Sequence, residues 1–360
     1  MIRKVLQRTF YGILVVWGVV TIVFFLFNIL PGDPARMLLG QRSDLRSVEM
    51  VRAELGLDRP LYLQYLRYLN DLSPLSLYNT ADPDSYFFYS SEKYGGLRIP
   101  VKVHSWSPFL KAPYLGISYQ NRRTVGSMIA GALPNTFILA LLSIVLASLV
   151  GTLLGFRCAL RKDSFFDRSA IFLSTLGMSL PSFFAAILIG WIFAYLLSDF
   201  THLNLTGNLI EPDDFGDGNR VHPENIILPA ITLAIRPLSV IVQIARSSLL
   251  DALNQDYVRT ARAKGLPYKK VVRKHAVRNS LNPLITAISG WFASLMAGVV
   301  FVEYIFGWKG LGYMIVNGLN QYDMPVVLGS VITIAVIFVV INILVDFAYA
   351  LLDPRVRTAQ

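Results

Sequence analysis

The fold is decided by the longest uncharged stretch of the chain, which runs from Thr124 to Phe156 and reads TVGSMIAGALPNTFILALLSIVLASLVGTLLGF. A transmembrane helix needs about 20 consecutive apolar residues, so this stretch is long enough to cross a bilayer. Further windows of sufficient length lie on both sides, one of them interrupted only by Arg236. They are Thr9–Gly32, Ser169–Ser198, Asn225–Ala245, Asn279–Val302 and Met324–Val345. The sequence therefore predicts an all-α integral membrane protein with six transmembrane helices.

The composition supports the membrane class. Of the 360 residues, 54% are hydrophobic and 16% are charged, which is too apolar for an ordinary soluble domain. The net charge of +10 does not indicate a nucleic-acid partner, because the basic residues flank apolar segments instead of forming one dense stripe. A single cysteine, Cys158, excludes an internal disulfide, and the four scattered histidines form no ligand cluster. We expect no metal site, no cofactor and no nucleic-acid partner.

Charges in the loops indicate the orientation of the spans, because short cytoplasmic loops carry an excess of Lys and Arg. Basic residues precede the first window, join the second to the third and follow the sixth, whereas the loop Asp199–Glu224 is acidic. This pattern predicts a multi-pass protein of the inner (cytoplasmic) membrane with both termini in the cytoplasm. Its parts are residues 1–32, a tail and the first helix; 33–123, an extracytoplasmic helical scoop and insertion; and 124–360, a five-helix core.

The large extracytoplasmic region between the first and second windows has two parts. Ser47–Leu72 shows helical spacing of its apolar residues. Ser73–Pro113 is broken by proline, glycine and aromatic residues, which indicates a small loop-rich or β-like insertion. Aromatic side chains such as those of Tyr86–Tyr89 and Trp106 either bind a ligand or partner, or pack on the membrane surface or on neighbouring loops.

The loop 251–280, between the fourth and fifth windows, is the most basic of the chain. Its spacing predicts one helix that stops at Gly265, where a left-handed cap suits glycine, and a second helix that Pro267 opens. On a helical wheel of the second helix, Val277 alone falls on the basic side. The apolar arc holds Tyr268, Val271, Val272, His275 and Ala276. Two short helices are therefore expected to meet at a sharp corner.

Two interpretations of this corner stay open on the residues alone. A basic amphipathic helix beside a membrane is typical of an anchor for lipid headgroups, which accounts for the charges. Small side chains allow another protein's backbone to approach closely, and Ala261, Ala263 and Gly265 lie at the corner. The loop is therefore either a membrane-lipid anchor or a docking site for a protein partner.

The segment Asp256–Leu266, DYVRTARAKGL, resembles the EAA loop of ATP-binding cassette (ABC) importer permeases, in the form found in the dipeptide, oligopeptide and nickel permease family. Other motifs of that family follow in order and cover nearly the whole chain. They are Leu30–Pro34, Leu55–Leu61, Leu133–Thr136, His275–Asn279, Val302–Phe306, Gly310–Gly312 and Leu352–Arg357. The chain departs from the family in the insertion Ser73–Pro113 and at Lys309, where the family often has proline.

The resemblance implies a permease subunit with defined partners. These are cytosolic ATP-binding subunits, a second homologous permease subunit and an extracytoplasmic substrate-binding protein. It also implies that loop 251–280 forms coupling helices seated in a cleft of the ATPase, with Ala261 and Gly265 at the closest approach. The docking residues expected on this basis are Tyr257, Thr260, Ala261, Ala263, Gly265 and Leu266.

Arg236 is the one clearly mid-span charge. It lies about ten residues into its window, or about 15 Å deep, where a lipid-facing arginine is costly. It is therefore expected to face protein or a watery cavity. Either it lines the translocation pathway and meets a peptide carboxylate, or it pairs with an acid such as Glu303 or Asp346.

The sequence does not predict an enzyme. It contains no Gly-x-x-x-x-Gly-Lys phosphate-binding loop, and we find no paired carboxylates, histidine cluster or Ser/His arrangement at membrane depth. Catalytic residues are therefore not expected, and ATP hydrolysis is assigned to a separate subunit. The expected function is half of the translocation pathway of an ABC importer, with peptides as the first-choice substrate. The alternatives are nickel or another small solute in the same architecture, or a gradient-driven secondary transporter.

Overall fold

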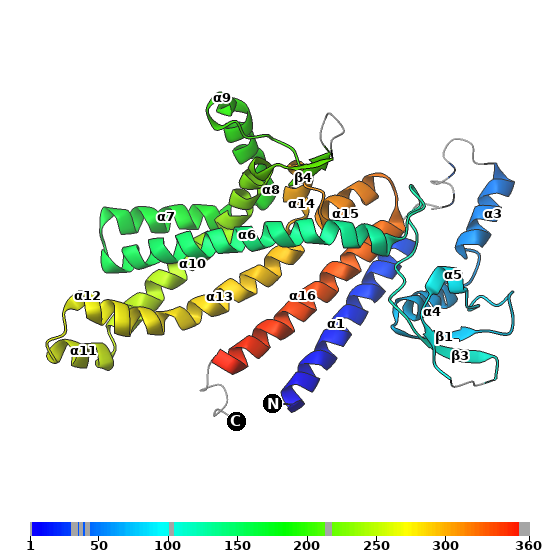
Figure 1. Cartoon of the computed structure of the whole chain (residues 1–360), viewed down its shortest axis with the longest axis horizontal. Helices are drawn as coiled ribbons and strands as arrows, with labels where there is room; N and C mark the ends of the chain where they lie inside the picture. Colours follow the sequence, from blue (N-terminus) through cyan, green and yellow to red (C-terminus); the bar gives the residue numbers. More distant parts are fainter. Residues whose placement is uncertain are drawn as a thin grey trace. The chain divides into compact units, whose positions relative to one another are not determined.

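The computed structural model describes residues 2–29, 35, 39, 44–100, 104–212 and 218–352 (Figure 1). The chain divides into two compact units, which we describe separately. The core unit comprises residues 1–16, 132–316 and 333–360. The insertion unit comprises residues 17–131 and 317–332. The insertion unit thus includes the second half of the first helix and the later segment 317–332.

Helices dominate the chain, as predicted. The long ones are α1 (Ile2–Ile29), α6 (Val125–Leu160), α7 (Phe165–Ser179), α10 (Ile227–Leu253), α13 (Val277–Gly298) and α16 (Met324–Leu352). The shorter α-helices are α8 (Ser182–Ile189), α9 (Ser198–Thr201), α11 (Asp256–Ala263), α12 (Tyr268–Val271), α14 (Val300–Ile305) and α15 (Leu311–Asn320). Two π-helical stretches follow α8 and α12, at Gly190–Leu196 and Val272–Ala276. A 3₁₀ turn at Pro223–Ile226 precedes α10.

Within the described residues, four helices are long and apolar enough to cross a membrane. They are Gln7–Leu26, Val125–Leu160, Pro223–Leu253 and Met324–Val345. A fifth span is possible if α7 and the helix Ser182–Leu196 count as one, although the two are bent by 109°. The remaining predicted window, Asn279–Val302, forms α13 and the start of α14, and α13 is not among those four helices.

The bend in the third predicted window lies at Pro181. Proline lacks the N–H group that a helix interior needs, and it restricts the preceding residue to extended conformations. Accordingly, α7 ends at Ser179, Leu180 is extended (φ −74°, ψ 126°) and α8 begins after Pro181. Pro181 therefore divides this window into two helices. Pro237, in contrast, lies inside α10, which continues to Leu253 without a break.

Close packing in the core unit depends on glycines of α6. A Cβ atom built on Gly155 would lie 2.5 Å from the Val242 carbonyl oxygen of α10, and one on Gly151 would lie 3.0 Å from Ile241. These glycines form a Gly-x-x-x-Gly pattern, which is a known signal for close approach of membrane helices. The hydrophobic core of this unit includes Leu139, Ile144, Leu233, Ile241, Met296, Phe306 and Trp308.

The insertion unit contains a small antiparallel sheet, as the pattern over Ser73–Pro113 indicated. Helices α3 (Leu45–Leu55) and α4 (Leu61–Leu72) precede it, separated at Gly56 (φ 69°). The strands are β1 (Leu75–Asn79), β2 (Leu97–Arg98) and β3 (Trp106–Leu110), in the order β1-β3-β2, and α5 (Ser91–Tyr94) lies between β1 and β2 in the chain. Leu75 is paired with Leu110, and Asn79 with Trp106. The core unit has a hairpin of its own, β4 (Ile210–Pro212) with β5 (Asn219–Val221), which was not predicted.

Aromatic residues of the insertion pack on one another. Tyr78, Tyr94 and Phe109 are buried together, and the ring of Tyr89 stacks on Phe109 with 3.8 Å between centroids. The buried carboxylate of Asp71 accepts hydrogen bonds from the hydroxyls of Tyr78 (2.9 Å) and Tyr94 (3.3 Å). Of the aromatic residues singled out in the sequence, Tyr89 packs against this cluster, and Phe87 lies 5.8 Å from Trp106 between ring centroids. These contacts favour the packing interpretation for those three residues.

Candidate functional site

Helices α11 and α12 form a corner at one end of the core unit. They lie at the end of α10 and α13, the helices that lead into and out of the loop 251–280 (Figure 1). Helix α11 spans Asp256–Ala263 and α12 begins at Tyr268, so the chain turns within a few residues. The two predicted helices and the turn between them are therefore present.

Gly265 makes the turn possible. Its φ of +76° lies in the left-handed region, which costs glycine little and side-chain-bearing residues more. The N–H of Gly265 donates to the Arg262 carbonyl (2.9 Å), and the N–H of Leu266 donates to the Ala261 carbonyl (3.4 Å). This pair of bonds is the Schellman motif, which ends a helix by satisfying its last carbonyl groups. Pro267 then stands immediately before α12, so both predicted boundary signals are confirmed.

A small apolar cluster supports the corner from within. It joins Ala159 of α6, Leu249 and Ala252 of α10, Val258 and Ala261 of α11, Val271 of α12, and Ala276. Leu266 packs against it, as the hydrophobic contact of a Schellman motif requires. The side chain of Ala261 is only 6% exposed. Most of the Ala261 side chain is therefore covered by its own chain, and its contact with the ATPase stays a prediction.

Other predicted docking residues face outward. Tyr257 is 38% exposed, and Thr260, Ala263 and Gly265 are also exposed. A Cβ atom built on Gly265 would meet no heavy atom within 4 Å, so the space beside the turn is open. Tyr268 is exposed as well, and the Arg262 guanidinium lies 5.1 Å from its ring centroid. The corner thus presents aromatic and small side chains on both sides of the turn at Gly265.

The second half of the loop separates apolar from basic residues, with one deviation from a regular helix. Val271, Val272 and Ala276 are buried, whereas Tyr268, placed on the same arc by the wheel, is exposed. The basic residues Lys269, Lys270, Arg273, Lys274 and Arg278 are all exposed. Val277, which fell on the basic side of a 3.6-residue wheel, packs against the apolar cluster. The π-helical turn at Val272–Ala276 adds a residue to one turn and so shifts the phase of the positions that follow.

An ion pair near the corner was not predicted. The Arg246 guanidinium of α10 donates to both carboxylate oxygens of Asp167 in α7, at 2.6 and 2.7 Å. Asp167 is 1% exposed and also accepts a bond from the Asp163 N–H (2.9 Å). This two-bonded geometry is the strong form of an Arg–carboxylate pair. It fixes α7 to α10 near the loop.

Glu303 forms a second polar site within the core unit, which we call the Glu303 network. The fully buried carboxylate accepts bonds from Thr136 Oγ1 (2.7 Å), the Gly312 N–H (2.7 Å) and the Tyr313 N–H (3.2 Å). Thr136 Oγ1 in turn accepts from the Leu311 N–H (2.8 Å). The network brings together three motifs singled out in the sequence, Leu133–Thr136, Val302–Phe306 and Gly310–Gly312.

Residues next to the Glu303 network strengthen the same junction. Trp308 Nε1 donates to the Asn135 carbonyl (3.0 Å), and Asn135 Nδ2 donates to the Lys309 carbonyl (2.9 Å). The Lys309 N–H also donates to Asn208 Oδ1 (3.3 Å). Lys309, where the family often has proline, therefore uses an N–H group that proline lacks.

Arg236 is exposed on α10 and has no ion pair with any side chain that the structure describes. The proposed pairing with Glu303 is wrong, since that carboxylate is bonded to Thr136 and to the N-terminus of α15. The side chain of Asp346, the other suggested partner, lies outside the described part. Motif Leu30–Pro34 and most of Leu352–Arg357 also lie outside it. In the residues that are described, no group of His, Cys, Asp and Glu could hold a metal ion.

Comparisons with known proteins cover almost the whole chain. Residues 151–358 match the family model of the binding-protein-dependent transport system inner membrane component, and residues 1–82 match the model of the N-terminal part of such membrane components. A protein named as a peptide permease in Brucella suis biovar 1 (strain 1330) is 32% identical over 360 residues, with 99% of each chain covered. The dipeptide transport system permease protein DppB of Escherichia coli (strain K12) is 32% identical over 375 residues, again with 99% of each covered. The chain belongs to the family of inner membrane components of binding-protein-dependent transport systems, and its resemblance to the dipeptide and oligopeptide ABC permeases is confirmed.

Proposed function

We propose that this chain forms half of the translocation pathway of an ATP-driven peptide importer and that its α11–α12 corner docks a separate ATPase subunit. One observation carries the docking role. The corner exposes Tyr257, Ala263 and the open side of Gly265 in the segment that connects the helices α10 and α13. Motion of a partner at the corner would pass into both helices. ATP hydrolysis itself is assigned to the partner.

The proposed assembly has four kinds of component. They are this chain, a second homologous permease, cytosolic ATP-binding subunits and an extracytoplasmic substrate-binding protein. We place six spans in the membrane and both termini in the cytoplasm, with α13 and the bent α7–α8 pair as spans. The excess of Lys and Arg in the loop at the corner supports this orientation.

Peptides are proposed as the substrate because relatives aligned over their full length are named as peptide or dipeptide permeases. Arg236 is proposed to line the pathway and to meet a peptide carboxylate. Its exposure on α10, and the engagement of Glu303 elsewhere, support that role. Nickel or another small solute is the alternative cargo. The ligand bound to the partner binding protein, identified by mass spectrometry after purification, distinguishes these classes.

Docking is tested by cross-linking in the complete transporter. Cys158 is buried and is first replaced by Ser, after which Ala263→Cys places one thiol at the corner. Lys270→Cys, exposed on the basic side of the next helix, is the matched control. A thiol-directed photo-cross-linker is expected to join the Ala263→Cys variant to the ATPase in much higher yield than the control. Equal yields would contradict docking at the corner.

Uptake by vesicles that contain the permeases without the ATPase would support a gradient-driven transporter instead.

A further inference from the structure

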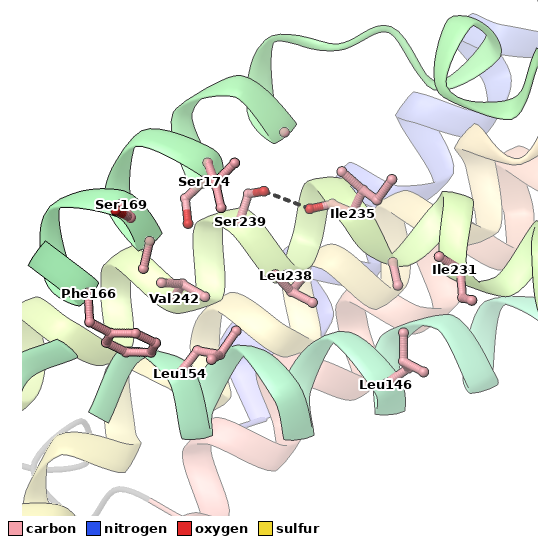
Figure 2. A pocket seen from close by; sticks show the side chains of 14 residues that line it. Leu146, Leu154, Phe166, Ser169, Ser174, Ile231, Ile235, Leu238, Ser239 and Val242 are labelled. Carbon is pink, nitrogen blue, oxygen red and sulfur yellow. Dashed lines mark hydrogen bonds between the residues drawn. The ribbon is translucent and has the colours of Figure 1, made fainter. Parts of the chain in front are cut away.

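The core unit contains an apolar cavity of about 440 Å³ between α6, α7 and α10. Figure 2 shows Leu154 of α6, Phe166 of α7 and Val242 of α10 around it. Of the serines in the lining, Ser239 turns its hydroxyl to the Ile235 carbonyl of its own helix, at 2.8 Å (Figure 2). Ser169 and Ser174 are the other two hydroxyl-bearing residues in the lining, and the remaining lining residues are apolar. The cavity therefore suits a hydrocarbon better than water or a polar solute.

The length of the cavity matches one leaflet of a bilayer. Its lining on α7 extends from Phe166 to Gly177, which corresponds to about 16 Å at 1.5 Å per residue. The hydrocarbon core of a bilayer is about 30 Å thick, so one leaflet contributes about half of that. Leu173, on the wall of the cavity, is 64% exposed, so the cavity is accessible from outside the chain. An acyl chain that enters from the side can lie along α7.

Positive charge is concentrated at the Phe166 end of this cavity. The turn between α6 and α7 carries Arg161 and Lys162, and Arg168 follows in the first turn of α7. All three are exposed, and Phe166 of the cavity lies between Lys162 and Arg168 in the sequence. Asp167 is neutralised by its two bonds to Arg246. Asp163 is then the one exposed acid between residues 157 and 168 of the described chain. A net positive turn beside an apolar groove is complementary to a lipid with an anionic headgroup.

We propose that this cavity binds one acyl chain of an anionic phospholipid from the cytoplasmic leaflet, with its phosphate at Arg161, Lys162 and Arg168. The inference rests on the membrane placement and orientation proposed above. The bound chain fills the space between α7 and its neighbours at α6 and α10. It thereby supports α7 over the length between the Asp167–Arg246 pair and the bend at Pro181.

The acyl site is tested with the complete transporter in vesicles that contain phosphatidylglycerol with a photoactivatable diazirine in one acyl chain. Peptide mapping is expected to find adducts concentrated on cavity residues such as Leu173 and Leu238. Ala170→Phe fills the cavity and should lower that labelling severalfold. Thr175→Phe, on an exposed position of the same helix outside the lining, should leave it unchanged. Equal loss in both variants, or adducts spread evenly over Phe172 and the cavity residues, would overturn the site while leaving the membrane placement intact.

The headgroup contact is tested by charge. Each Lys or Arg near an anionic surface contributes about 1 kcal/mol, so the double variant Arg161→Gln/Lys162→Gln should lose about tenfold or more of its preference for the phosphatidylglycerol probe. A phosphatidylcholine probe should label the unaltered protein less. Equal labelling by the two probes would overturn the anionic specificity. Cross-links from Leu173→Cys to the second permease in place of lipid would show that a protein helix occupies the groove, which also overturns the proposal.

Discussion

The α11–α12 corner and the Glu303 network differ in what holds them together and in how exposed they are. The corner is held by alanine and valine packing and by backbone bonds from the N–H groups of Gly265 and Leu266, and its outer face exposes Tyr257 and Ala263. The network is held by a buried carboxylate whose three hydrogen bonds come from neutral donors. A buried polar group without a partner is costly, whereas an exposed small residue can be enlarged with little cost to folding. Changes at the corner should therefore affect coupling, and changes in the network should affect folding.

The largest effect is expected for Glu303→Ala. It leaves Thr136 Oγ1 and the N–H groups of Gly312 and Tyr313 without their acceptor, which should destabilise the core unit by about 3 kcal/mol or more. The measurement is thermal unfolding of the purified transporter, together with the fraction that remains monodisperse in detergent. Asp199→Ala, at an exposed acid, is the control and should behave as the unaltered protein. An unchanged unfolding midpoint for Glu303→Ala would contradict the expectation that the Glu303 network, and not the corner, determines folding stability.

Thr136→Val should have a smaller effect of the same kind. Valine keeps the shape of threonine but removes the hydroxyl that donates to Glu303 and accepts from the Leu311 N–H. The expected loss is about 1–3 kcal/mol, measured in the same unfolding assay. Combining it with Glu303→Ala should give less than the sum of the two losses, because both changes remove one shared bond. Additive losses would mean that the two residues act independently.

The smallest effect on folding, but a large one on coupling, is expected for Gly265→Leu. A left-handed leucine costs about 1–2 kcal/mol locally, and its side chain projects into the open space where the partner is proposed to approach. Membrane insertion should be normal, while substrate-stimulated ATPase activity should fall. Gly265→Asn separates strain from bulk, since asparagine tolerates left-handed φ better than leucine. Normal assembly and transport in Gly265→Leu would argue against the docking role.

Local signals in the sequence were sufficient to predict the helix boundaries at the corner, whereas the long-range contacts of Glu303 could not be predicted. Gly265, Pro267 and Pro181 act on the residues next to them, so their effects could be predicted. The partners of Glu303 lie 167 residues away at Thr136 or are backbone N–H groups, which have no signature in the sequence. The sequence therefore indicates Glu303 only as a possible partner for Arg236. The inward position of Val277 could not be predicted either. It follows from the π-helical turn at Val272–Ala276, which is defined by backbone hydrogen bonds and has no sequence signature here.

Two packing features differ in how far the sequence could predict them: the burial of Ala261 and the close approach of α6 to α10. Ala261 shares the small size of its neighbours, and size alone does not distinguish an alanine that faces a partner from one that fills a cluster. Gly151 and Gly155, in contrast, carried a readable small-x-x-x-small signal within the longest apolar stretch, and sequence reasoning missed it.

The position of Glu303 has an electrical consequence for helix α15. The first N–H groups of a helix carry partial positive charge and attract anions. In α15 the chain supplies the acceptor itself, because a carboxyl oxygen of Glu303 occupies the N–H groups of Gly312 and Tyr313. The positive pole of α15 is thus capped from inside the protein. A negatively charged solute could use that pole only after displacing Glu303.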